Sequence, residues 1–204
     1  MKYVNKLEEL EFGKVYHIYN KAISNDLLFR KEDDYYFFLR KLEKFILPIA
    51  EIYAYCLIPN HFHLLLYIRP EDNIKSGILK RASITGRNPI TQAFANFFNS
   101  YSKSYNIAYN RMGRLFLYPF KRILVDKEDY LLTLINYIHR NPIHHGIVKN
   151  FSEWKYSSYN TILSNKPTKI ERAYIIQLLG SKKDFVLFHE QNKTKPGMDS
   201  YSLE

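Results

Sequence analysis

The chain has 204 residues, a length typical of one domain rather than two. Its hydrophobic content of 46%, with 18 Tyr and 14 Phe against 7 Gly, excludes disordered and collagen-like proteins. Thirty Lys and Arg against 20 Asp and Glu give a formal net charge of +10. This excess favours polyanionic partners, because binding them releases their counterions.

The chain holds a single cysteine, Cys56, so an internal disulfide and a thiolate metal cage are excluded. Its longest apolar run, residues 52–58, is far shorter than the ~18 residues that span a bilayer. The first thirteen residues include three acids and no apolar core, unlike a secretory signal. We therefore expect a cytoplasmic protein with no membrane partner.

The first half of the chain predicts a strand, a helix and a hairpin. Residues 15–19 alternate apolar and polar side chains, as a strand does. Residues 32–46 open with acids, carry apolar side chains along one face and end before a proline, which is typical of a helix. Two strand-like runs, residues 49–57 and 61–68, flank the turn Ile58-Pro59-Asn60 and predict a hairpin.

The second half predicts a helix over residues 89–106 and a strand or strand pair over 114–125. A further helix begins at Asp126 and should stop near Asn141, because Pro142 disfavours helical geometry in the residue before it. The order of strands and helices predicts an α+β fold, an antiparallel sheet with helices packed on it.

After residue 157 we expect one short helix, over residues 171–179. The polar residues beyond it contain few apolar side chains. We therefore expect one domain over residues 1–180 and a loosely ordered tail over 181–204.

Residues 73–125 contain nine basic side chains and no acidic one, interleaved with aromatic rings. Such a mixture suits single-stranded nucleic acid, since cations follow the phosphates and rings stack on bases. Alternatively, the rings belong to the core and the cations form a solvated face. The predicted nucleic-acid-binding residues are Arg111, Arg114, Lys121 and Arg122.

Two histidines stand at the start of the second hairpin strand. His61 and His63 are two positions apart, so both imidazoles project from one face while Phe62 turns to the other. Two imidazoles one strand step apart form half of a divalent metal site. The pair alone is a weak indication of metal.

The helix before Pro142 supplies a second set of polar groups. Tyr130, Leu134, Tyr137 and Asn141 fall on one helical face, with Tyr137 and Asn141 one turn apart. Asn141 lies at the carboxyl end, where the helix dipole favours a cation, and its amide oxygen is a hard ligand. Two imidazoles, one amide oxygen and no thiolate suit Mg²⁺ or Mn²⁺ better than a structural zinc.

A tyrosine beside such a metal could act as a covalent nucleophile. Against a phosphodiester, the metal would polarise a non-bridging oxygen while the phenolate attacks phosphorus. However, Tyr137 is one of 18 tyrosines, and an amphipathic helix face usually packs. The residues alone therefore favour Tyr137 as a core residue.

Several segments resemble a known family. Residues 54–66 (AYCLIPNHFHLLL) and 137–142 (YIHRNP) resemble the single-tyrosine HUH transposases, in particular the REP-associated tyrosine transposases. The resemblance continues in order through residues 16–20, 113–122 and 154–159, and so covers about residues 13–163 with motif spacing intact.

This resemblance implies a ferredoxin-like antiparallel sheet that carries both histidines, with the tyrosine on a helix packed nearby. It implies that His61, His63 and Asn141 bind Mg²⁺ or Mn²⁺, and that Tyr137 attacks single-stranded DNA. The products would be a 5′-phosphotyrosine link and a free 3′-hydroxyl. Members recognise a DNA hairpin beside a short single-stranded cleavage site. Both homodimers that exchange their tyrosine helices and monomers occur among them.

Two alternatives remain in view. A metal-dependent hydrolase or deaminase is disfavoured, because zinc deaminases need paired cysteines and a Glu two residues after the first ligand, where this chain has His63. A domesticated DNA-binding protein without activity would have lost Tyr137 or a ligand, and none is lost. We expect His17 to hydrogen-bond within the sheet, with a place lining the site from the neighbouring strand as the alternative. We expect His139, His144 and His145 to lie at the surface or contact phosphate.

Overall fold

The computed structural model describes residues 9–24 and 26–192. The strands in this part of the chain are β1 (Val15–Lys21), β2 (Ala50–Ile58), β3 (His61–Ile68) and β4 (Lys121–Val125). The α-helices are α1 (Glu32–Phe45), α2 (Ser76–Thr85), α3 (Pro89–Ala108), α4 (Glu128–His144), α5 (Tyr159–Leu163), α6 (Arg172–Leu179) and α7 (Lys182–Gln191). None of these helices has the length and apolar character needed to cross a bilayer.

The four strands form one sheet in the order β2-β3-β1-β4, and every neighbouring pair is antiparallel. The hairpin between β2 and β3 turns at Pro59 and Asn60, as the sequence predicts. Chain order and strand order together are those of a ferredoxin-like fold. The predicted α+β class is confirmed.

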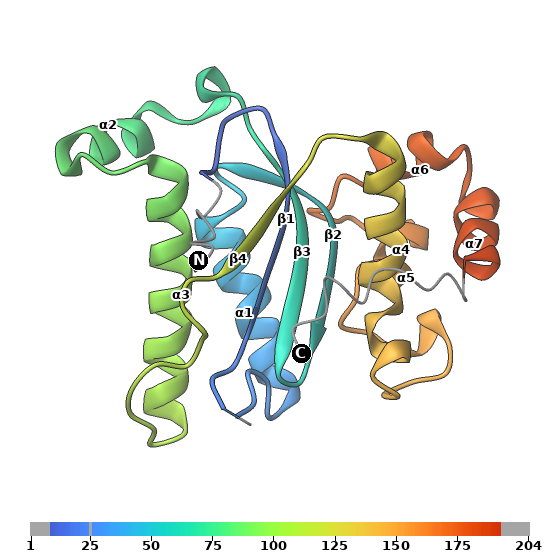
Figure 1. Ribbon diagram of the computed structural model, residues 1–204, viewed down its shortest axis with the longest axis horizontal. Helices are drawn as coiled ribbons and strands as arrows, with labels where there is room; N and C mark the ends of the chain where they lie inside the picture. Colours follow the sequence, from blue (N-terminus) through green and yellow to red (C-terminus); the bar gives the residue numbers. More distant parts are fainter. Residues whose placement is uncertain (1–8, 25, 193–204) are drawn as a thin grey trace, which may run out of the picture.

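Helices cover both faces of the sheet. Figure 1 shows α1 and α3 on one side and α4, followed by α5 to α7, on the other. Alternation along β3 divides its side chains between these layers. Phe62 points toward α1, where its ring lies 5.0 Å from that of Phe38, while His61 and His63 point toward α4. Both layers are packed, since β3 is buried at seven of its eight positions.

Helix α4 runs past Pro142 to His144, so the predicted stop near Asn141 is wrong. Proline removes one helical hydrogen bond, but the last turn is closed by others: His145 N donates to Asn141 O at 3.1 Å, and Ile147 N donates to Pro142 O at 2.9 Å. One missing bond close to a helix end costs less than unwinding a packed turn.

Three further expectations need correction. The strand predicted over residues 114–125 is regular only in β4, and Phe116 makes a single bridge to Ala22. Helices α2, α5 and α7 were not predicted. Residues 182–191 form α7 rather than a loose tail, because Phe185 and His189 are buried against the domain. The rest of the predicted tail, 193–204, lies outside the described residues.

Candidate functional site

The start of β3 places His61 and His63 beneath α4. Their exposed fractions are 5% and 0%. In the antiparallel pairing of β1 and β3, Lys21 is opposite His61 and Tyr19 is opposite His63. Because directly paired residues share a face, these four side chains lie on the side of the sheet that α4 covers. The predicted common face of the two imidazoles is therefore present.

The imidazole of His61 lies between two amide oxygens. Its Nδ1 is 2.8 Å from Asn60 Oδ1, and its Nε2 is 2.9 Å from Asn141 Oδ1. Burial is the main reason why the pKa of His61 is lowered to about 3, so the ring is neutral and carries one proton. When Nδ1–H donates to Asn60, two lone pairs face each other between His61 Nε2 and Asn141 Oδ1.

Two converging lone pairs suit a bound cation. Neighbouring ligands of an octahedral Mg²⁺, at bond lengths of about 2.1 Å and right angles, are separated by about 3.0 Å. The separation of His61 Nε2 and Asn141 Oδ1 is 2.9 Å. This pair thus has the spacing of two adjacent ligands of a small divalent cation.

His63 offers the third donor. Its Nδ1 is 2.9 Å from Nε2 of His17, whereas its Nε2 is buried and has no hydrogen-bond partner among the described residues. Burial lowers the pKa of His63 well below its usual range, so this ring is neutral as well. A buried nitrogen without a hydrogen-bond partner lowers the stability of the fold. A bound ligand such as a metal ion would remove this cost.

The donor set fits a divalent cation held by His61, His63 and the amide of Asn141. Nowhere in residues 9–24 and 26–192 do three His, Cys, Asp or Glu side chains gather into a metal-binding group. A set of three donors at this point would include the amide oxygen of Asn141. Two nitrogens and one oxygen without thiolate favour Mg²⁺ or Mn²⁺ over structural zinc.

Helix α4 carries Tyr137 to the same place. Its half-buried ring stands edge-on to His63, with centroids 5.4 Å apart, and edge-on to His17 at 6.2 Å. Asn141 follows one turn later on the same helix. The sequence alone favoured Tyr137 as a core residue, but the structure sets its ring beside the imidazoles.

Sequence reasoning missed Lys21 near the site and expected His145 only at the surface or on phosphate, not beside His61. Lys21 lies opposite His61, and the ring of His145 lies 4.8 Å from that of His61. After burial, the charges of His145 and Lys21 also lower the pKa of His61. No local pattern signals either residue, because Lys21 reaches the site through strand pairing and His145 through the turn after α4.

His144 is exposed, as expected, whereas His17, His139 and His189 are buried. His17 hydrogen-bonds within the sheet, as expected, and its partner is the predicted ligand His63. His139 is 1% exposed, so its expected surface position is wrong. Its Nδ1 lies 2.8 Å from His189 Nε2, and its Nε2 lies 2.6 Å from Ser158 Oγ. The missed helix α7 supplies His189 and hides this ring.

The predicted basic residues have different surroundings. Arg111 forms an ion pair with Asp26, Nε to Oδ2 at 2.5 Å, and donates to the carbonyl of Arg114, so it braces its own loop. Arg114 and Arg122 line an open cavity beside α3. Lys121 is exposed at the start of β4. Many rings of the same stretch belong to the core, among them Phe94, Phe97, Tyr101 and Phe116.

Comparisons with known proteins agree with the resemblance. A relative from Haemophilus influenzae, named as a REP-associated tyrosine transposase, is 28% identical over 113 residues, which cover 54% of this chain and 59% of that protein. A solved structure of a REP-associated tyrosine transposase bound to a REP hairpin matches with a TM-score of 0.55 and 15% identity, over 79% of this chain and 87% of that chain. No family model matches.

The match with the Haemophilus protein thus spans less than two thirds of that protein's length, and the structural match shows a shared fold. Together they support the group indicated by the motifs: this chain resembles the REP-associated tyrosine transposases in sequence and in fold.

Proposed function

We propose that this protein is a transposase that nicks and rejoins single-stranded DNA beside hairpins, with Tyr137 as its nucleophile. The observation that carries the proposal is the meeting of Tyr137 and Asn141, from α4, with His61 and His63, from β3. Hydrophobic packing alone gives no reason to bury three polar side chains next to a tyrosine, so this cluster indicates a functional site. The sequence and fold likeness to REP-associated tyrosine transposases supports it.

In this proposal His61, His63 and Asn141 hold Mg²⁺ or Mn²⁺. The cation, when bound, polarises a non-bridging oxygen of the scissile phosphate and orients that phosphate. Tyr137 attacks in line: the bond from its phenolic oxygen to phosphorus forms as the bond from phosphorus to O3′ breaks. The tyrosine loses a proton and the 3′ oxygen gains one. One ester replaces another, so attack by the 3′-hydroxyl reverses the step without an energy source.

The DNA path in this proposal uses cations around β4, of which Arg114 and Lys121 are exposed and Arg122 is half-buried. Arg114, Lys121 and Arg122 contact phosphates, and Arg111 shapes the loop through its ion pair with Asp26. The matching solved structure contains a REP hairpin, which supports a hairpin as the DNA partner. Such contacts position the substrate and do not react with it.

The test uses labelled single-stranded DNA from the region that flanks the protein's own gene, with Mn²⁺. We expect a protein–DNA adduct that survives a denaturing gel. Tyr137→Phe should abolish the adduct and leave DNA binding unchanged, because only the reactive oxygen is removed. Tyr130→Phe, on the same face of α4 two turns earlier, is the matched control and should retain the adduct.

Two outcomes would contradict the proposal. Adduct formation by Tyr137→Phe would assign the nucleophile to another tyrosine, with Tyr130 the first to examine. Tight binding of hairpin DNA by the unaltered protein, with no adduct in Mg²⁺ or Mn²⁺, would instead identify a domesticated DNA-binding protein that keeps the fold.

A further inference from the structure

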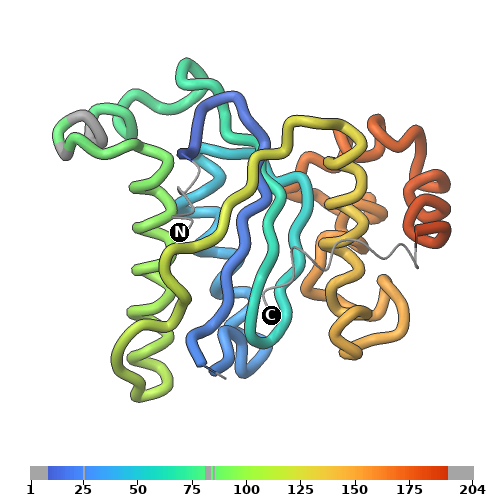
Figure 2. Tube along the Cα trace, viewed as in Figure 1, coloured from blue at the N-terminus to red at the C-terminus, as the bar shows by residue number. Residues whose placement is uncertain are grey.

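An open cavity of about 700 Å³ lies between α3 and residues 113–120, the segment that leads into β4. Figure 2 shows this segment passing from the foot of α3 to the sheet, alongside β1. The volume is within the range of about 300–1,000 Å³ typical of small-molecule sites. The metal-binding set does not use any residue of this cavity.

The cavity combines aromatic walls with polar and cationic groups. Phe98 of α3 packs against Phe116 and Phe120, with ring centroids 5.0 and 5.2 Å away. Phe98 and Phe120 are only half-buried, so parts of both rings face the open space. Arg114 and Arg122 complete the lining.

The charged side chains that line the cavity are both positive, Arg114 and Arg122. None of the described residues that line it is acidic. The guanidinium of Arg122 lies 4.8 Å from the centroid of Phe120. A cation beside an accessible ring, with no acid, suits a flat aromatic group that carries negative charge.

The cavity and the candidate active site meet at one end of the sheet, on opposite faces. Lys21 ends β1 opposite His61, and its carbonyl accepts a hydrogen bond from Leu117 N at 3.0 Å. Arg122 pairs with Ile18 in the sheet, so its side chain points toward α3, away from the histidines. Since β4 is the last strand of the sheet order, a flexible polymer can reach both faces around it.

We infer that this cavity binds one unpaired nucleotide of the single-stranded DNA, with its base against Phe98 and Phe120 and its phosphate near Arg114 and Arg122. The inference rests on the proposed function and adds to it a base that is read away from the site of cleavage. Stacking on an aromatic ring tolerates any base, while the polar side chains of Asn99 and Ser102 at the wall can favour particular base edges.

The experiment measures binding alone, so that cleavage does not enter. Fluorescence anisotropy with Tyr137→Phe and no divalent metal gives the affinity for a hairpin with a single-stranded flank. A set of such DNAs lacks one unpaired base each. We expect one flank position at which removing the base weakens binding by about tenfold, the size of one stacked base.

Ala95→Trp tests where that base binds. Ala95 is half-buried in the cavity wall, and an indole there would fill the space. This variant should bind intact DNA about tenfold more weakly and no longer respond to the missing base. Asn96→Trp, at the exposed neighbouring position outside the lining, is the matched control and should behave as the parent. Thr91→Trp, at an exposed position of the wall, replaces Ala95→Trp if circular dichroism shows that Ala95→Trp is unfolded.

Two results would overturn the inference. In the first, removing any one unpaired base of the flank leaves the binding affinity unchanged. In the second, a folded cavity-filling variant binds intact DNA as tightly as the parent and loses the same affinity when the base is removed. Adduct formation by the unaltered protein on the same DNA tests the proposed function separately. A protein that forms the adduct but binds normally with the cavity filled would keep the function and lose the nucleotide site.

Discussion

The imidazole of His17 meets that of His63 edge to edge, with Nε2 and Nδ1 2.9 Å apart and both residues 0% exposed. Burial keeps both rings neutral, because it lowers the pKa of His17 to about 3 and that of His63 well below its usual range. One proton lies between the rings. If His63 donates it, Nε2 of His63 keeps its lone pair for a cation. If His17 donates it, the Nε2 of His63 is protonated and blocked. His17 therefore determines whether His63 can act as a ligand.

Replacing His17 should weaken metal binding without direct contact with the metal. His17→Phe keeps a ring of similar size but removes the acceptor for His63 Nδ1–H, so we expect Mn²⁺ affinity to fall by about 10- to 100-fold. Titration calorimetry measures this affinity, and nitrogen NMR of the His63 ring reports which nitrogen is protonated. His189→Phe, a buried ring far from the ligands in the sequence, is the control. Equal Mn²⁺ affinity in His17→Phe and the parent would show that His17 does not control metal binding by His63.

Asn141 should tolerate a carboxylate but not an alanine. Its Nδ2 has no hydrogen-bond partner among the described residues, so Asn141→Asp loses no bond and presents oxygen to His61 in either orientation of the group. We expect Asn141→Asp to bind Mn²⁺ at least as tightly as the parent and Asn141→Ala to bind it at least about tenfold more weakly. Calorimetry of both variants measures the difference. Equal binding by Asn141→Ala would show that the amide is not a ligand.

The buried contact between His139 and His189 should contribute to stability. His139→Phe leaves His189 Nε2 without its partner and removes one bond of the Ser158 hydroxyl, which keeps its bonds to the Tyr55 backbone. We expect a loss of about 1–3 kcal/mol in the free energy of unfolding. Urea denaturation measures it. His144→Phe, at an exposed position of the same helix, should change that free energy by less than about 0.5 kcal/mol. Equal stabilities of the two variants would contradict a structural role for His139.

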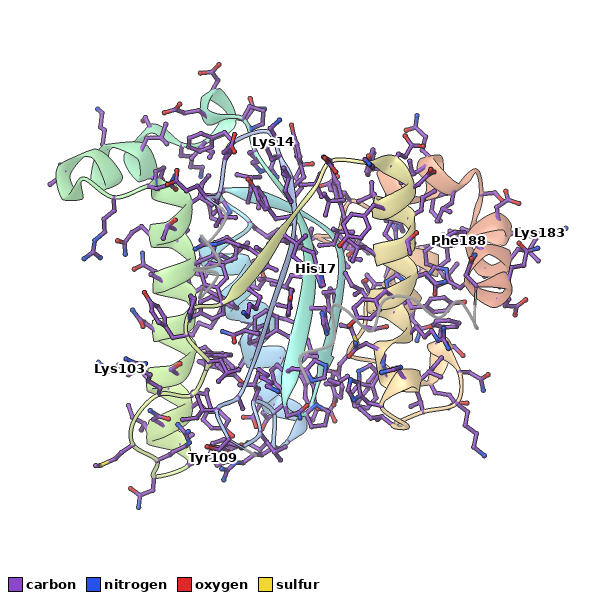
Figure 3. All side chains as sticks on the ribbon, viewed as in Figure 1. Lys14, His17, Lys103, Tyr109, Lys183 and Phe188 are labelled. Carbon is purple, nitrogen blue, oxygen red and sulfur yellow. The ribbon has the colours of Figure 1, made fainter. Side chains whose placement is uncertain are left out.

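Hairpin binding should depend steeply on salt. If Arg114, Lys121 and Arg122 each contact a phosphate, replacing one by alanine should make the slope of log affinity against log salt shallower by about 0.7–0.9. Lys183→Ala is the control. Figure 3 shows Lys183 on α7 and Lys103 on α3, at opposite sides of the molecule. A slope unchanged in all three test variants would place the DNA elsewhere.

Local sequence patterns predict how site residues within a single strand or a single helix are arranged. Alternation along residues 61–68 suffices to put His61 and His63 on one face, because the period of a strand is local. Helical spacing likewise places Tyr137 and Asn141 together. That α4 covers the histidine face of the sheet followed from the family resemblance and not from these periods.

Features that depend on long-range pairing could not be predicted. The contact of His17 with His63 and the position of Lys21 follow from the register between β1 and β3, which no local pattern encodes. Helix α7 buries only Phe185 and His189, too few residues for a recognisable period. At Pro142 the local rule was overridden, because the packed end of α4 tolerates a missing hydrogen bond.

The attachment of the chain after α4 constrains how a second copy could share Tyr137. Residues 126–127 alone join β4 to α4, whereas later segments are bonded to the edge of β2: Leu57 N to Tyr156 O at 3.0 Å, Ser158 N to Tyr55 O at 2.9 Å, and Glu171 N to Ile52 O at 2.9 Å. A swap of α4 alone could keep these bonds only if residues 145–155 reached back from the neighbour to the first copy. For Tyr137 to act in the active site of a second copy with these bonds replaced, residues 128–191 would have to rotate as one block about residues 126–127. The block would then form the same hydrogen bonds with β2 of the second copy. Exchange of Tyr137 between two copies is thus coupled to the contacts that residues 156–171 make with the edge of β2.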